Sequence, residues 1–192
     1  MIEIGNARGL IFDCDGTLID SMPLHMKAWE HAFFSIGEVY NHTYLDSKKG
    51  MKESDIIELY NKDFNRNLDP HQIVQIKHNY FKIHLKILKP IQPVVDIVLK
   101  YYGVKNMGVV SGSTREIVHQ ELEVIGIKDK FDYILTADDP FKPKPAPDKF
   151  FEAARLMNLP SEDCLVFEDG DPGILAAQEA GMRTIDVRKI DC

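Results

Sequence analysis

The stretch Leu10-Ile11-Phe12-Asp13-Cys14-Asp15-Gly16-Thr17-Leu18 is a short apolar run that ends in two carboxylates, a glycine and a hydroxyl. Residues two apart in a strand point to one face of a sheet, so Asp13 and Asp15 are expected to meet at the carboxyl end of a strand, where parallel sheets place ligands. Gly16 permits a turn with positive φ directly after them. Two carboxylates this close repel unless a proton or a divalent cation lies between them, which indicates acid or nucleophile chemistry beside Mg²⁺. A plain strand followed by an Asp-Gly turn is the alternative interpretation of these residues alone.

Three later segments end in groups suited to phosphate or metal. Residues 109–114 are a strand-like run that ends in Ser111 and Gly112, residues 142–148 are a stiff proline-rich loop that carries Lys144, and residues 165–170 are an apolar run that ends in acids. The four segments, in this order, resemble the motifs of the haloacid dehalogenase-like superfamily of phosphotransferases. The matching motifs are Asp-x-Asp-Gly-Thr, a strand-end serine, Lys-Pro-Ala-Pro-Asp and Glu-Asp, and together they span nearly the whole chain.

Strand and helix patterns alternate from Pro90 to the end of the chain, which predicts an α/β fold with a parallel sheet covered by helices on both faces. The resemblance implies a Rossmann-like core of residues 1–17 and 89–192, with an inserted α-helical cap over residues 18–88. The expected elements after the first strand, at about 9–14, are helices near 92–102, 114–125, 147–157 and 172–180, and strands near 107–111, 132–136, 164–168 and 183–187.

The predicted cap begins with a helix that Ser21 is expected to cap and Gly37 to end. Apolar residues recur in it at helical spacing, which is more typical of a small helical core than of a ligand site. A polar segment follows, and then helical patterns near 53–60 and 70–88.

Composition is that of an ordinary globular protein, with 192 residues, 44% hydrophobic and 28% charged. The net charge of −7 argues against nucleic acid or an anionic membrane as a partner, although local lysines and a metal still permit a phosphorylated substrate. Cys14, Cys164 and Cys192 form no disulfide framework. Since no targeting or membrane-spanning segment is visible, a cytoplasmic protein is expected, and the lack of an exposed apolar stripe favours a monomer.

Further motifs narrow the resemblance. Residues 20–37, the Lys-Pro-Ala-Pro-Asp run and residues 167–174 are similar to the β-phosphoglucomutase-like branch of the superfamily. The short length and the ending 180–188 look most like its small sugar phosphatases, which hydrolyse fructose 1-phosphate and 6-phosphogluconate. The resemblance therefore implies a Mg²⁺-dependent phosphatase that acts on a small phosphorylated sugar.

The resemblance also assigns roles to the charged residues of the motifs. Asp13 is the expected nucleophile, which forms an aspartyl-phosphate, and Asp15 is the expected general acid and then base. Asp13, the backbone carbonyl of Asp15, Glu168 and Asp169 are the expected Mg²⁺ ligands. Lys144 is expected to neutralise the phosphoryl oxygens and to orient Asp13.

Ser111 is expected to contact phosphate through its hydroxyl, with Gly112 letting backbone N–H groups approach, while Gly16 and Thr17 add contacts from the first motif. Ser111 is also a candidate for a simple helix cap, and Ser113 competes with it. Lys142 competes with Lys144, but only Lys144 directly precedes Pro-Ala-Pro-Asp.

The cap offers further candidates. His25 matches a position near the hinge of the branch, where it would touch substrate or assist Asp15; a purely structural histidine is the alternative. Lys52 is a candidate substrate contact in a polar stretch that also holds Lys48 and Lys49, although a solvated face explains such lysines as well. The sequence assigns no role to Lys77.

Two other functions remain open from the sequence. The first is a β-phosphoglucomutase, which grips a second phosphate partly with a cap arginine shortly after a glycine. Here Gly50 is followed by Met51, Lys52 and Glu53, so that Glu53 stands at the position of the arginine. A carboxylate there would repel the second phosphate. The second is a catalytically silent sugar-phosphate-binding protein, which the intact acids and lysine of the motifs disfavour.

Overall fold

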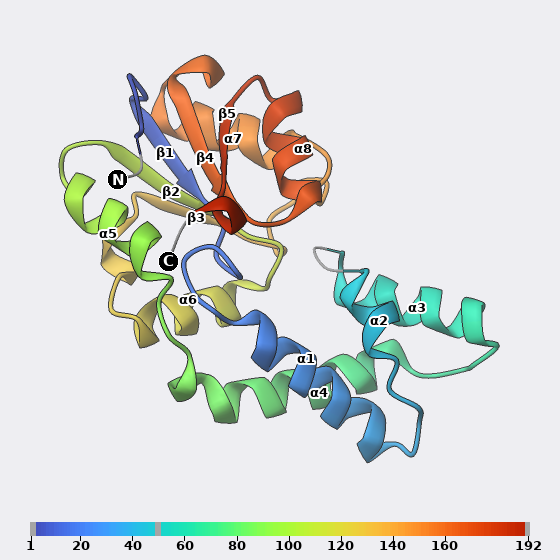
Figure 1. The fold of residues 1–192 in the computed structure, drawn as a ribbon. Coiled ribbons are helices and arrows are strands. Elements are labelled where there is room, and N and C mark those ends of the chain that lie inside the picture. The colour runs from blue at the N-terminus through green and yellow to red at the C-terminus, as the bar shows by residue number, and fades with distance from the viewer. Residues whose placement is uncertain (1–2, 49–50, 191–192) are drawn as a thin grey trace.

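The computed structural model describes residues 3–48 and 51–190 (Figure 1). Its centre is a five-stranded, fully parallel sheet in the order β3-β2-β1-β4-β5. The predicted α/β class with a parallel sheet is therefore confirmed. The strands are β1 (Gly9–Phe12), β2 (Asn106–Val110), β3 (Tyr133–Leu135), β4 (Cys164–Glu168) and β5 (Arg183–Asp186).

Helices cover both faces of the sheet because successive strand residues point to opposite sides. On one face Leu10 and Phe12 of β1 pack with α5 (Gln92–Tyr101) and α6 (Arg115–Val124). On the other face Ile11 packs with α7 (Asp148–Met157) and α8 (Asp171–Glu179). The central strand is thus buried on both sides, which explains its continuous apolar run.

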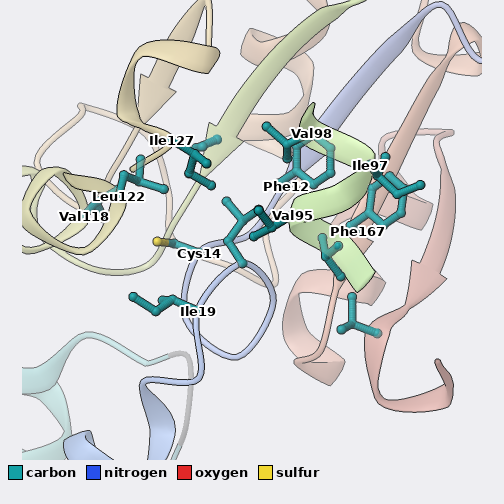
Figure 2. Close-up of a cluster of buried hydrophobic side chains, with 14 of the residues drawn as sticks. Phe12, Cys14, Ile19, Val95, Ile97, Val98, Val118, Leu122, Ile127 and Phe167 are labelled. Carbon is teal, nitrogen blue, oxygen red and sulfur yellow. The ribbon is translucent and has the colours of Figure 1, made fainter. Parts of the chain in front are cut away.

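The main hydrophobic cluster, part of which is drawn in Figure 2, contains residues of the sheet and also Leu24 and Ala28 of the first cap helix. Phe12 and Phe167, on the neighbouring strands β1 and β4, stack with their ring centroids 4.8 Å apart. The same cluster takes in Ile19 after the first motif and Phe81 near the end of the cap. The two chain segments that connect sheet and cap are therefore anchored in the main core.

The cap has a second core of its own, which includes Trp29, Phe33, Ile57 and Ile73. Its helices are α1 (Met22–Ser35), α2 (His42–Asp46), α3 (Glu53–Phe64) and α4 (Pro70–His84), and α1 packs along α4 (Figure 1). A helical cap region is therefore present, while its boundaries at residues 18 and 88 stay predictions.

Local differences from the sequence-based expectations have physical causes. The pattern at 70–88 is an α-helix to His84 followed by a 3₁₀ turn, η1 (Leu85–Ile87), and Pro90 just after it forms a bridge with Ile19. The short helix α2 was not predicted; the Asn41 side chain accepts from Tyr44 N–H at its start. The remaining 3₁₀ turns are η2 (Lys128–Lys130), η3 (Ser161–Asp163) and η4 (Val187–Lys189).

Ser21 precedes α1 as expected, but its hydroxyl makes no capping bond to that helix. It donates to Asp15 instead, 2.6 Å away. The helix-cap pattern therefore predicts the start of the helix correctly, but it does not predict that the Ser21 side chain binds Asp15. Within the described residues, no helix is both long and apolar enough to cross a membrane.

Candidate active site

A cleft of about 630 Å³ lies between the carboxyl edge of the sheet and the cap helices. Its core side carries Asp13 and Asp15 after β1, Gly112 and Ser113 after β2, and the acids at the end of β4. Its cap side comes from α1, α3, α4, the end of α2 and the segment after it. The cap residues that line it are Met22, His25, Met26, Trp29, Leu45, Asp46, Ser47, Lys48, Met51, Glu53, Ile56 and Lys77.

Lys144 lies between two carboxylates at the core end of the cleft. Its Nζ donates to Asp13 Oδ1 at 2.7 Å and to Glu168 Oε2 at 2.8 Å. Burial opposes the charged ammonium, but Asp13 and Glu168 outweigh that cost and raise the pKa of Lys144. Lys144 is therefore a fixed positive charge, and the competing Lys142 is exposed on the same loop.

Three carboxylates crowd around this lysine. Asp13, Glu168 and Asp169 each offer an oxygen within 4.8 Å of the others. Burial and the charge of Glu168 raise the pKa of Asp13 to about 8, and burial and Asp13 raise the pKa of Asp169 to about 7. One lysine does not balance three acids, and a divalent cation with oxygen ligands fits this excess of negative charge.

Two glycines let these carboxylates lie where they do. Gly16 has φ +78°, and a Cβ there would lie 2.3 Å from Asp169 Oδ2. A Cβ at Gly173 in α8 would lie 2.2 Å from the carboxyl carbon of Glu168. The buried Thr17 hydroxyl donates to Asp169 Oδ1 at 3.0 Å. Gly16 and Thr17, expected as substrate contacts, therefore shape and hold Asp169 in this structure.

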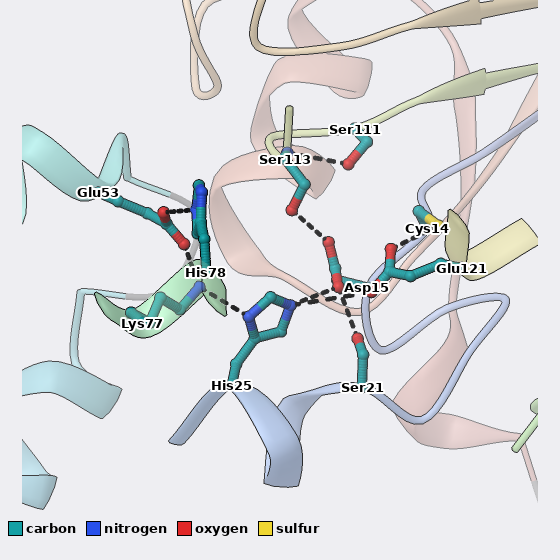
Figure 3. A network of polar contacts seen from close by, with 10 residues as sticks. All are labelled: Cys14, Asp15, Ser21, His25, Glu53, Lys77, His78, Ser111, Ser113 and Glu121. Carbon is teal, nitrogen blue, oxygen red and sulfur yellow. Dashed lines mark hydrogen bonds and ion pairs between the residues drawn. The ribbon is translucent and has the colours of Figure 1, made fainter. Parts of the chain in front are cut away.

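Asp15 accepts three hydrogen bonds (Figure 3). Ser21 Oγ and His25 Nε2 donate to Oδ1 at 2.6 and 2.7 Å, and Ser113 Oγ donates to Oδ2 at 2.6 Å. Burial opposes ionisation of Asp15, but His25 and the two hydroxyls outweigh it and hold the pKa of this carboxyl well below its usual range. Asp15 is thus ionised while its neighbour Asp13 resists ionisation, so the two acids of the first motif are electrostatically distinct.

His25 extends this network into the cap. Lys77 Nζ lies 2.8 Å from His25 Nδ1, and since an ammonium only donates, Nδ1 accepts and the ring proton belongs to Nε2. Burial and Lys77 lower the pKa of His25, in keeping with a neutral ring. Lys77 and His78 in turn bind the Glu53 carboxylate (Figure 3). A continuous polar chain therefore runs from Asp15 on the core to Glu53 on the cap.

Behind Asp15 lies a buried acid that the sequence did not single out. Glu121 of α6 is fully buried, and the Cys14 thiol donates to its Oε2 at 3.4 Å. Burial and the charge of Asp15 raise the pKa of Glu121 strongly, which favours its protonated form. Its place in the sequence, on an apparently amphipathic helix, gave no signal of this contact.

Two of the remaining predicted residues, Ser111 and Lys52, are not among the residues that line the cleft. Ser111 is fully buried, and its hydroxyl accepts from Ser113 N–H at 3.0 Å, whereas Gly112 and Ser113 line the cleft. Ser111 as a phosphate contact stays a prediction. Lys52 is exposed at the start of α3, so its substrate contact also stays a prediction. Lys48 lines the cleft, and Lys49 lies outside the described residues.

Comparison with known proteins shows the family of the chain. A family model described as haloacid dehalogenase-like hydrolase matches residues 10–187. Fructose-1-phosphate phosphatase YqaB of Escherichia coli K12 is 36% identical, over 94% of this chain and 96% of its own. Beta-phosphoglucomutase of Bacillus subtilis 168 is 25% identical, over 94% of this chain and 83% of its own.

Solved structures share the fold. CbbY from Rhodobacter sphaeroides, in complex with phosphate, superimposes with a TM-score of 0.81 at 20% identity, over 96% of this chain and 90% of that one. A beta-phosphoglucomutase from Clostridium difficile gives a TM-score of 0.79 at 24% identity, over 93% and 83%. At these identities the likeness concerns the fold alone.

Proposed function

The chain is a phosphatase that belongs to the haloacid dehalogenase-like hydrolase family, and from this premise we propose that its substrates are small sugar monophosphates. The observation that carries the proposal is a cleft that holds Asp13, Asp15 and Lys144 at one end and cap side chains at the other. Likeness to a fructose-1-phosphate phosphatase supports the sugar class. In this proposal residues 18–88 act as the cap that shields the reaction from water.

Asp13 is the nucleophile of the proposed reaction. One carboxylate oxygen attacks phosphorus in line with the bond to the sugar oxygen, so that the phosphoryl group passes to Asp13. Lys144 binds the other oxygen, Oδ1, at 2.7 Å, and its charge offsets the charge of the phosphoryl oxygens. Ser111, Ser113 and the backbone after Gly112 are the remaining candidates for contacts to those oxygens.

Asp15 moves the protons. It first donates a proton to the sugar oxygen, and it later takes a proton from the water that attacks the phosphoaspartate. The bonds from His25, Ser21 and Ser113 favour its ionised form, which the second step needs. The first step needs the protonated form, and a bound phosphate dianion raises the pKa of Asp15 in that direction because like charges oppose ionisation.

Asp13, Glu168, Asp169 and the backbone carbonyl of Asp15 would hold Mg²⁺. When bound, this cation supplies positive charge to the carboxylates and to the phosphoryl group. Phosphate release should therefore stop on exhaustive chelation and return when Mg²⁺ is added back. Full activity after chelation would contradict this part of the proposal.

Phosphate release from fructose 1-phosphate, 6-phosphogluconate, glucose 6-phosphate and β-glucose 1-phosphate tests the proposed function. The Asp13→Asn variant serves as the blank, because an amide cannot form the phosphoaspartate. We expect release by the wild type and none above background from the variant. Turnover that survives Asp13→Asn would refute the covalent mechanism.

The same assay separates hydrolysis from isomerisation. Formation of glucose 6-phosphate from β-glucose 1-phosphate, with little free phosphate, would make the protein a mutase. Binding of sugar phosphates with neither product would make it a silent binding protein. We expect free phosphate without isomer formation.

A further inference from the structure

Glu53 is the acidic residue that opens α3, and its side chain lines the cap end of the cleft. The side chain is 26% exposed, so a ligand in the cleft can reach it. Lys77 and His78, both on α4, bind its two oxygens (Figure 3). Lys77 and His78 hold the pKa of Glu53 far below its usual range despite burial, so the group is a fixed negative charge.

The positive charge of Lys77 is already matched. Its side chain is 2% exposed, its ammonium binds Glu53 and His25 Nδ1, and it lies 5.3 Å from the centroid of the Trp29 ring. Lys77 therefore has little left to offer an anion in the cleft. Among residues 3–48 and 51–190, the other lysine on the cap side of the cleft is Lys48, which lies over the Tyr44 ring at 5.1 Å.

The two ends of the cleft thus differ in what they can bind. The core end has Lys144 and a set of acids suited to a divalent cation, which together can take one phosphate. The cap end presents a carboxylate whose counter-charge lies buried behind it. A carboxylate accepts hydrogen bonds from hydroxyl groups, and it repels a second anion.

We propose that Glu53 is a specificity residue that binds hydroxyl groups at the far end of the sugar and rejects substrates with a second negative charge there. This inference rests on the proposed function and narrows it. The preferred substrates are sugar monophosphates with a neutral polyhydroxylated tail. Bisphosphates and phosphorylated sugar acids are disfavoured.

Two matched substrate pairs test the proposal. Fructose 1-phosphate and fructose 1,6-bisphosphate differ by one phosphate at the far end, and sorbitol 6-phosphate and 6-phosphogluconate differ by a hydroxymethyl against a carboxylate. The measurement is kcat/KM for phosphate release from each, with fructose 6-phosphate as the product scored for the bisphosphate. For the wild type we expect a preference of about tenfold or more for the neutral tail in each pair.

Glu53→Gln keeps the shape of the side chain, removes its charge and leaves Lys77 with an unmatched positive charge. The preference for the neutral tail should therefore shrink by about tenfold. Glu58→Gln is the matched control, since Glu58 is an exposed acid on the same helix and does not line the cleft. It removes the same charge and should leave both ratios unchanged.

The ratio of two substrates within one variant cancels any loss of folded protein. If Glu53→Gln does not fold, the double variant Glu53→Gln/Lys77→Met removes both charges of the buried pair and should also narrow the preference. Unchanged ratios in these variants, or an equal change in Glu58→Gln, would overturn the role of Glu53. Phosphate release from none of the four substrates by the wild type would instead refute the proposed function, and this inference with it.

Discussion

The two walls of the cleft each contain a buried lysine, and the two lysines are balanced differently. On the core wall, Lys144 faces Asp13 and Glu168, with Asp169 close by. On the cap wall, Lys77 faces the single carboxylate of Glu53 and the neutral ring of His25. The core wall therefore has more carboxylates than its lysine can balance, whereas on the cap wall the charge of Lys77 is already matched by Glu53.

This difference separates two tasks that one cleft must perform. A wall with excess carboxylates becomes stable in its ionised form only when a cation joins it, so it suits metal-assisted phosphate chemistry. A wall on which a partly exposed carboxylate is paired with a buried lysine needs no added cation, so it suits hydrogen bonding to the hydroxyl groups of a sugar. Substitution of Lys144 should therefore mainly lower activity, whereas substitution of Lys77 should mainly lower stability.

The largest effect is expected at the core wall. Lys144→Met removes the positive charge beside Asp13 and the phosphoryl group, and phosphate release from fructose 1-phosphate should fall by about 10³-fold. Lys142→Met, on the same loop but exposed, should retain nearly full activity. Comparable rates for the two variants would remove Lys144 from the mechanism.

At the cap wall we expect a loss of stability. Lys77→Met leaves Glu53 without its buried counter-charge, and the free energy of unfolding in urea should fall by about 3 kcal/mol. The double variant with Glu53→Gln should recover part of this loss. As a control, Lys128→Met breaks the exposed pair with Glu123 and should cause no measurable change. Equal effects at the two sites would mean that the cap pair is no more than a surface contact.

A smaller effect should come from Gly173→Ala in α8. Alanine normally stabilises a helix relative to glycine, but here the added Cβ would meet the Glu168 carboxyl at 2.2 Å. The Mg²⁺ concentration that gives half-maximal phosphate release should therefore rise about tenfold. Leu175→Ala, at an exposed position of the same helix, is the control. An unchanged Mg²⁺ requirement would argue against Glu168 as a ligand.

The smallest expected effect is on the pH dependence of the chelated protein. Asp13 and Asp169 have a folded-state pKa raised to about 8 and about 7, so the folded chain holds protons that the unfolded chain has released. Stability should therefore decrease by about 1–2 kcal/mol between pH 7 and 8.

Urea unfolding at these pH values measures that decrease. Saturating Mg²⁺ should flatten it, because a bound cation favours the ionised carboxylates. Asp169→Asn should flatten it partly, because one of the two titrating groups is gone. If stability falls equally steeply with pH in the presence and absence of Mg²⁺, the cation does not bind these acids.

Much of the fold and of the core wall could be predicted from the sequence. Strands followed by Asp13, Gly112 and Asp169 predict one polar edge, since parallel strands end on the same side of a sheet. The predicted preference for Lys144 over Lys142 came from its motif, and the structure has Lys144 buried on Asp13 with Lys142 exposed. Their catalytic roles stay predictions.

The contacts of the cap wall could not be predicted from the sequence, for a physical reason. Glu53 and Lys77 are 24 residues apart and lie on different helices, so no local period relates them. The sequence predicts Ser21 as a helix cap, but in the structure its hydroxyl donates to Asp15, because a serine hydroxyl can bond to whichever acceptor the fold brings near.

The sequence by itself determined which residue types stand at the ends of the parallel strands, because strand periodicity and short local motifs decide that. Only the tertiary structure decided how their charges are shared: that Asp15 is held ionised by His25, that Glu121 is buried behind it, and that Lys77 neutralises Glu53. Charge balance depends on the distances between charged groups and on their burial, and a local sequence pattern determines neither.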